Sequence, residues 1–158
     1  MRRMVPGLPD DYVTKLENLK SMGAVVVILA LKHRLLTDGT YWLSLPANQP
    51  DKSHAEFPFL ALVEHTNYMD RAHYGNDHLV YCGDYLPPDH PYFDYDKEQL
   101  LDEYLPGLTR INPDFQRDWV RASWMFTERY AQPIPTLNYS ENIPPLKTPI
   151  EGLWMANM

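Results

Sequence analysis

The sequence contains very little cysteine, since Cys82 is the only one among 158 residues. A lone cysteine cannot form a disulfide within the chain, so folding does not depend on an oxidising compartment. Its neighbours Gly83 and Asp84 provide no base that would activate the thiol as a nucleophile. We therefore expect Cys82 to be a small residue within a strand.

A long apolar run is also missing. The longest one, residues 23–31, has about half of the roughly 20 residues that a membrane helix requires. It lies too far from residue 1, behind an acidic amphipathic segment, to be a secretion signal. We expect no membrane span, and a cytoplasmic protein.

Glycine is scarce, and the seven glycines are isolated from one another. The sequence has no Gly-x-Gly-x-x-Gly segment and no Walker sequence. This chain alone therefore lacks the usual cradle for a dinucleotide pyrophosphate. A Gly-x-Ser-x-Gly nucleophile elbow is absent as well, which argues against a hydrolase triad.

Basic residues are few and scattered. The formal net charge is -7, so the chain lacks the basic surface of a nucleic-acid binder. Three histidines, His65, His73 and His78, lie near acidic residues, but their spacing matches no known ligand pattern. We expect no metal site, and a metal hydrolase is the weakest of three functional classes considered.

Apolar and aromatic residues are plentiful, at 44% and 13% of the chain, which is enough for the core of one domain. The periodicity of the apolar residues predicts two helices and six strands. The predicted helices are residues 10–21 and 94–108, and the predicted strands are residues 24–31, 41–45, 57–65, 78–85, 119–130 and 152–156.

The expected pairing and breaks follow from glycine, proline and turn residues. Gly23 is expected to end the first helix, and the apolar strand 24–31 to be buried on both faces. The turn signal at residues 37–39 predicts a β-hairpin between strands 24–31 and 41–45. Pro106 is expected to stop or kink the second helix. The order of elements fits an α+β fold with a largely antiparallel sheet.

Polar side chains follow two of the predicted strands directly. The sequence Glu64-His65-Thr66-Asn67 ends one apolar strand, and Tyr130-Ala131-Gln132-Pro133 ends another. Such clusters contact substrates in many proteins, but they also cap strands and bond to loop backbone. Trp42 is open to the same two interpretations, as a residue of a pocket or of the core. The residues alone leave both alternatives open.

Several segments together resemble the middle region of bacterial FAD-dependent oxidoreductases, the relatives of protoporphyrinogen oxidase, flavin amine oxidases and carotenoid desaturases. The resemblance covers nearly the whole chain. The segments that carry it are Leu8-Pro9-Asp10-Asp11-Tyr12, Tyr41-Trp42-Leu43, Phe57-Pro58-Phe59, Glu64-His65-Thr66-Asn67, Tyr130-Ala131-Gln132-Pro133 and residues 148–158.

The resemblance implies a mixed, largely antiparallel sheet with helices packed on one face, which is the substrate domain of such enzymes. The glycine-rich FAD segment and the last flavin-binding helix of the family are not in this sequence. Residues 1–158 are therefore expected to be a substrate-binding domain truncated at both ends and inactive alone. The implied cofactor is FAD in the full-length enzyme, which accepts a hydride from a small organic substrate.

The resemblance also suggests where contacts lie. It does not assign a catalytic role to any residue of this chain. It implies that Asn157 lies near the flavin of the full enzyme. The implied partner is the missing FAD-binding domain, and its absence would leave an exposed apolar patch that could support a dimer. The alternative is a stand-alone small α+β module that binds an apolar ligand or a protein partner. The candidates for facing the substrate cavity are Trp42, Glu64, His65, Asn67, Tyr130 and Gln132.

Overall fold

The fold is described by a computed structural model that covers residues 2–46 and 56–156. The chain divides into two compact units, Met22–Gln132 and the combination of Met1–Ser21 with Pro133–Met158. The larger unit contains most of the sheet and the longest helix. In the smaller unit, Tyr12 packs with Leu8 and Val13, and its hydroxyl donates to the Pro145 carbonyl at 2.8 Å.

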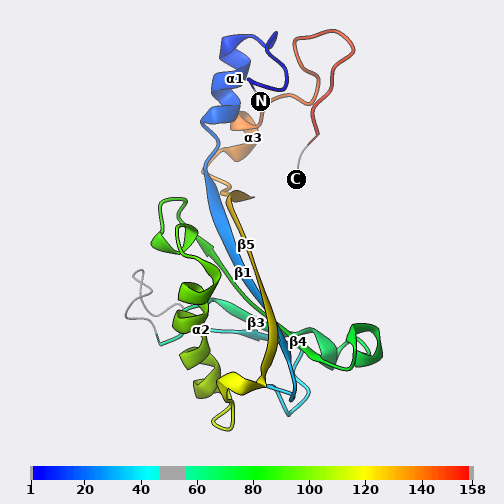
Figure 1. The fold of residues 1–158 in the computed structure, drawn as a ribbon. Coiled ribbons are helices and arrows are strands. Elements are labelled where there is room, and N and C mark those ends of the chain that lie inside the picture. Colours follow the sequence, from blue (N-terminus) through cyan, green and yellow to red (C-terminus); the bar gives the residue numbers. More distant parts are fainter. Residues whose placement is uncertain (1, 47–55, 157–158) are drawn as a thin grey trace. The chain divides into compact units, whose positions relative to one another are not determined.

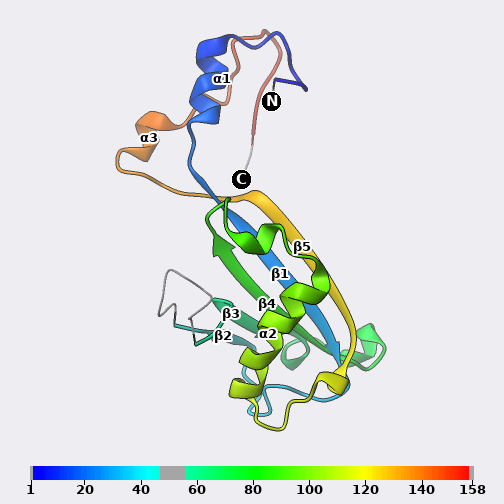
Figure 2. The ribbon, with the colours of Figure 1, turned by 60° about the vertical axis from the view of Figure 1, so that its left-hand side comes forward.

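A five-stranded sheet has the order β2-β3-β4-β1-β5 (Figure 1 and Figure 2). The strands are β1 Ser21–Leu31, β2 Trp42–Ser44, β3 Ala61–Glu64, β4 His78–Leu86 and β5 Val120–Pro133. β1 pairs with β4, β2 with β3 and β3 with β4, each in antiparallel orientation. The predicted α+β class with a largely antiparallel sheet is confirmed.

The predicted hairpin between residues 24–31 and 41–45 is wrong. β1 pairs with β4 and lies beside β5, whereas β2 pairs with β3. The turn signal itself is real, because Gly39 has a φ of 85° and its N–H donates to the Leu36 carbonyl. However, the segment between the two strands is a long connection rather than a tight hairpin loop.

Gly23 does not end the first helix. The helix α1, Asp10–Glu17, ends earlier than predicted, and Gly23 lies inside β1. A Cβ atom at Gly23 would lie 2.9 Å from the Glu128 carbonyl oxygen and would collide with the Phe93 ring. The glycine therefore allows close packing within the sheet, a role that sequence position alone does not distinguish from a helix end.

One face of the sheet is covered by the helix α2, Lys97–Ile111 (Figure 2). The helix begins at a capping box in which the Asp96 carboxylate accepts from the Gln99 N–H and the Gln99 side chain accepts from the Asp96 N–H. Pro106 lies inside the helix and does not stop it, contrary to one expectation. The buried residues of the helix are Leu100, Leu101, Tyr104, Leu105, Gly107 and Leu108.

The other face of the sheet has no helix against it among the described residues. Val25, Val27 and Leu29 of β1 are fully buried on the helix side, while the alternate residues Val26 and Ile28 are only partly buried. The predicted burial on both faces therefore fails for residues 24–28 and is met only at the end of the strand, where Leu29, Ala30 and Leu31 are all buried. We call the surface opposite α2 the open face.

Short elements connect the strands. The irregular stretch after β3 contains the 3-10 helices η2, His65–Asn67, and η3, Arg71–Tyr74. The remaining elements are η4, Pro91–Phe93, η5, Arg117–Trp119, and α3, Tyr139–Asn142. The strand predicted at residues 152–156 is wrong, since the described part forms only a single bridge between Lys147 and Trp154. None of the helices in the described ranges is long and apolar enough to cross a membrane.

Candidate functional site

The strand registers place two rows of side chains across the open face. Residues directly opposite one another in neighbouring strands point to the same side of a sheet. The register therefore aligns one row that includes two large aromatic side chains and a second row with no side chain larger than valine. The first row is Trp42, Val63, Tyr81 and Ile28, and the second is Ser44, Ala61, Gly83 and Val26.

A pocket of about 620 Å³ lies on this face. The small residues of the second row form its floor, and aromatic side chains surround them. Trp42 and Tyr85 are 58% and 50% exposed, which is unusual for such large apolar groups in a folded domain. The pocket is lined by Ala24, Val26, Tyr41, Trp42, Ser44, Leu60, Ala61, Val63, His65, Tyr81, Gly83, Asp84 and Tyr85.

Two of the residues singled out from the sequence, Trp42 and His65, line this pocket. The Trp42 indole N–H donates to the Ser44 hydroxyl oxygen at 3.2 Å, which fixes the ring beside the floor. The His65 Nε2 lies 2.8 Å from the Tyr74 hydroxyl oxygen, and its ring packs edge-on against Tyr81. These contacts hold both side chains at the edge of the pocket.

Glu64 and Asn67 do not line the pocket. The Glu64 carboxylate is fully buried and accepts from the backbone N–H groups of Leu35 and Leu36, at 3.3 and 2.5 Å. The Asn67 amide donates to the carbonyl oxygens of Leu36 and Thr40. Both side chains thus bond the backbone of the connection that leads into β2, which is the second of the two interpretations that the sequence left open.

Behind Glu64 lies a buried histidine. The His78 Nε2 lies 2.7 Å from a guanidinium nitrogen of Arg71, which can only donate, so Nε2 accepts and the proton of the neutral ring is on Nδ1. That Nδ1 lies 3.4 Å from the Glu64 Oε1. Burial, followed by the nearby Arg71 and Arg34 charges, lowers the pKa of His78 to about 4.

In Glu64, burial shifts the pKa in the opposite direction to that of His78. Burial raises the pKa of its carboxyl, and the hydrogen bonds from Leu36 and Leu35 oppose that rise. The carboxylate and the neutral imidazole belong to the side of the sheet that faces α2, because Glu64 is opposite Val80 in the register. Glu64 and His78 therefore lie on the opposite side of the sheet from the pocket and do not provide an acid or base within it.

The two candidates on β5 lie elsewhere. Tyr130 is 76% exposed and Gln132 is exposed as well, and neither lines the pocket. The remaining residue that the resemblance placed near a flavin, Asn157, lies outside the described residues. Sequence reasoning did not select Tyr81, Gly83 or Tyr85, although their alternate spacing within strand 78–85 was a signal that they share one face.

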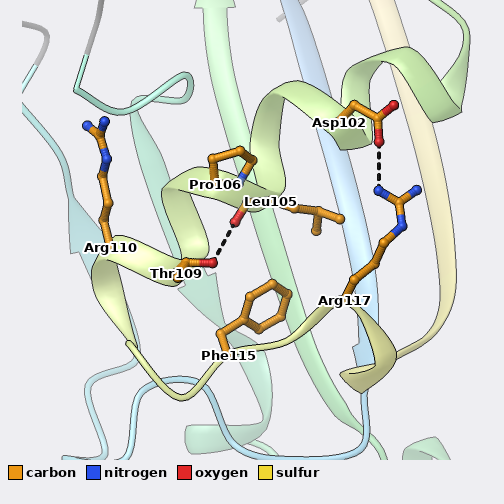
Figure 3. Close-up of a pocket in the computed structure, with 7 residues that line it drawn as sticks. All are labelled: Asp102, Leu105, Pro106, Thr109, Arg110, Phe115 and Arg117. Carbon is orange, nitrogen blue, oxygen red and sulfur yellow. Dashed lines mark hydrogen bonds and ion pairs between the residues drawn. The ribbon is translucent and has the colours of Figure 1, made fainter.

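A second pocket, of about 510 Å³, lies beside α2 and the segment that follows it (Figure 3). Its charged groups are already bonded. The Arg117 guanidinium binds the Asp102 carboxylate at 2.6 Å, and Arg110 donates to the Glu56 carbonyl oxygen. The polar groups that line it are thus satisfied within the protein, so this groove offers a ligand little beyond its apolar Leu105 and Phe115.

No group of three or more His, Cys, Asp or Glu side chains able to hold a metal ion is present in residues 2–46 and 56–156. Cys82 is fully buried in the core beneath α2, where burial raises the pKa of its thiol. Within this part of the chain, the pocket on the open face is therefore the best candidate for a functional site.

Comparison with solved structures relates this fold to oxidoreductases. A protein from Exiguobacterium sp. 255-15, provisionally assigned as a protoporphyrinogen oxidase, matches with a TM-score of 0.66 and 15% identity over 89% of this chain. An oxidoreductase from Methanosarcina mazei matches with a TM-score of 0.60 and 18% identity over 91% of this chain. This chain therefore has the fold of a part of these oxidoreductase chains.

The matched part is a minor share of both proteins. The present chain covers 29% of the Exiguobacterium protein and 30% of the Methanosarcina protein. No protein-family model matches the sequence, and no curated protein matches it either.

Proposed function

We propose that this chain is the substrate-facing domain of an FAD-dependent oxidoreductase, related in fold to amine oxidases and protoporphyrinogen oxidases. The open face of the sheet, with its apolar pocket of about 620 Å³, is the observation that carries the proposal. In the complete enzyme this face is the roof of the substrate cavity, and the flavin lies on the other side of that cavity.

In the proposed enzyme, FAD and the substrate contact different domains. The described glycines of this chain with positive φ, Gly39, Gly75 and Gly152, are isolated in separate turns and form no cradle for a pyrophosphate. We assign the binding of FAD to a separate FAD-binding domain of the same polypeptide. Bound FAD accepts the hydride, while the residues of this chain orient the substrate and exclude water.

Exposed aromatic residues on β5 support the proposal that another domain covers part of the open face. Met125 of β5 packs against the core beneath α2, so its neighbours Trp124 and Phe126 point away from that core. Both are exposed, at 45% and 58%. Trp124 and Phe126 thus form an exposed apolar area on β5, of the kind that occurs at interfaces. We assign this surface to contact with the FAD-binding domain.

The proposal is tested with the product of the complete gene. We expect the purified protein to show the absorption of bound oxidised flavin, and a screen of amines, porphyrinogens and polyenes to find a substrate that bleaches it. The variant Trp42→Ala should bind the same amount of flavin but bleach more slowly at low substrate concentration. The exposed Leu137→Ala, which lies in the other unit, is the matched control.

The rival function is a stand-alone module that uses the same pocket for an apolar ligand or a protein partner. It is favoured if the complete gene product binds no flavin. If flavin is present but is reduced at the same rate in Trp42→Ala as in the parent, the assignment of the open face to the substrate is contradicted.

A further inference from the structure

We propose that the pocket on the open face takes a flat, apolar molecule that carries no negative charge, and that Gly83 provides the space for it. The inference rests on the proposed function and deepens it by naming the class of substrate. Shape, charge and the chemistry of the lining residues each support it.

The shape is that of a slot with a flat floor. Gly83 lies opposite Val26 on one side and Ala61 on the other, so three neighbouring strands offer only small or narrow side chains there. A Cβ built on Gly83 would meet only Val26 Cγ2 at 3.6 Å and the Val25 carbonyl oxygen at 3.8 Å. Both are ordinary contacts, so the space above Gly83 is open toward the pocket.

Aromatic rings surround this floor. Trp42 and Tyr41 come from β2 and the residue before it, while Tyr81 and Tyr85 come from β4. Aromatic side chains contact a flat ring by offset stacking or edge-on, with a large contact area for each group. A flat conjugated ligand therefore matches both the floor and the walls.

The charge of the described lining disfavours anions. No lysine or arginine lines the pocket in the described ranges. Its polar side-chain groups are Ser44, His65, the Trp42 indole N–H, the tyrosine hydroxyls and one carboxylate. That carboxylate, Asp84, belongs to the helix side of β4, since it pairs with Val25. A buried anion without a cation loses hydration and gains no ion pair, whereas a cation gains contact with aromatic faces.

Shape and charge together narrow the class of ligand that fits this pocket. Polyenes and aromatic amines are flat, apolar and neutral or cationic. A ligand that carries carboxylates would bring negative charge to a face that offers no cationic partner among the described residues. We therefore infer a neutral or amine substrate.

The test uses three pyrene probes that share the ring system and carry a neutral, a cationic or an anionic substituent, namely pyrenemethanol, pyrenemethylamine and pyrenesulfonate. Binding to the chain is measured by fluorescence anisotropy. The neutral and cationic probes should each bind at least about ten-fold more tightly than the sulfonate. The preference should persist in high salt, where the repulsion by the net charge of -7 is screened.

Gly83→Val is the decisive variant. Valine suits a strand and fits beside Val26, but its methyl groups would fill the floor. We expect an unchanged circular dichroism spectrum and unfolding midpoint, with pyrenemethanol binding weakened about ten-fold or more, the loss expected when a ligand is excluded from an apolar site. Trp42→Ala should weaken binding in the same direction, and Leu137→Ala should not change it.

Two results would overturn the inference. One is a sulfonate that binds as tightly as the alcohol at high salt, and the other is full binding by folded Gly83→Val. A complete gene product without flavin would remove the proposed enzyme but leave the probe results intact, so the two failures are distinguishable.

Discussion

The carboxylate of Glu64 accepts a hydrogen bond from the backbone N–H of Leu36 at 2.5 Å, deep inside the protein. The backbone N–H of Glu64 donates to the Tyr41 carbonyl at 3.0 Å. One residue thus fixes both the connection after β1 and the segment that carries Tyr41 and Trp42 to the pocket. Glu64 thus positions Tyr41 and Trp42 beside the pocket although its own carboxylate does not line the pocket.

The substitution Glu64→Gln should destabilise the fold. One carboxylate oxygen becomes an amide nitrogen, which cannot accept from the N–H groups of Leu35 or Leu36. A buried donor left without a partner costs about 1–3 kcal/mol. Urea unfolding of Glu64→Gln should show this loss, whereas the exposed Glu103→Gln on α2 should be close to the parent. Equal stability of the two variants would contradict the anchoring role.

Stability should fall in mild acid because of His78. Its pKa is lowered from 6.5 to about 4 in the folded protein, so between these pH values the unfolded chain binds a proton that the folded protein does not. The stabilisation is present above pH 6.5 and is lost as the pH falls toward 4. Between about pH 7 and 5 this amounts to at most about 2 kcal/mol.

The variant His78→Asn isolates that contribution. The raised pKa of Glu64 acts in the opposite direction, since the folded protein then binds its proton more readily than the unfolded chain, but this term is largely shared by both proteins. The free energy of unfolding of the parent should therefore fall more steeply over this pH range than that of His78→Asn. Parallel pH profiles would show that His78 is not held neutral.

Tyr104 offers a test of the core beneath α2. Its side chain is fully buried, and its hydroxyl has no hydrogen-bond partner in the described part of the chain. Removing an unpaired buried hydroxyl while keeping the ring should be neutral or stabilising by about 1 kcal/mol. Tyr104→Phe should thus keep or raise the unfolding midpoint. A loss above about 1 kcal/mol would reveal a hydrogen bond to that hydroxyl.

Pro106 should lower the stability of α2. It lies inside the helix, where it has no N–H to donate to the Asp102 carbonyl and its ring crowds the preceding turn. Pro106→Ala is expected to stabilise the protein by about 1–2 kcal/mol, after allowing for the greater freedom of the unfolded chain. Thermal unfolding measures the change, with Glu103→Ala as the comparison. A lower melting temperature for Pro106→Ala would contradict this view of the helix.

The elements that depend on local pattern were predictable. The helix at Lys97–Ile111 follows from apolar spacing and the Asp96 cap, and β4 follows from strict alternation. Pairing was not predictable in the same way, because the turn at residues 37–39 shows only that the chain bends. Which strand lies beside β1 is decided by contacts from residues far along the chain, such as those of β4.

The site was predictable only in part, for a related reason. The polar cluster after β3 stands out in sequence, but the returning connection through Leu35 and Leu36 decides that Glu64 is an anchor while His65 faces the pocket. An apolar strand also looks the same in sequence whether a helix or a separate domain covers its second face. This is why β1 reads as a strand buried on both faces.

The central claim is that the open face contacts the substrate of a flavoenzyme. Its most direct test is the rate of anaerobic flavin reduction in the complete gene product, compared between the parent and Gly83→Val. The account predicts equal flavin content and a large loss of the reduction rate at low substrate concentration in Gly83→Val. Equal rates of reduction in the two proteins, with the variant folded and loaded with flavin, would contradict it.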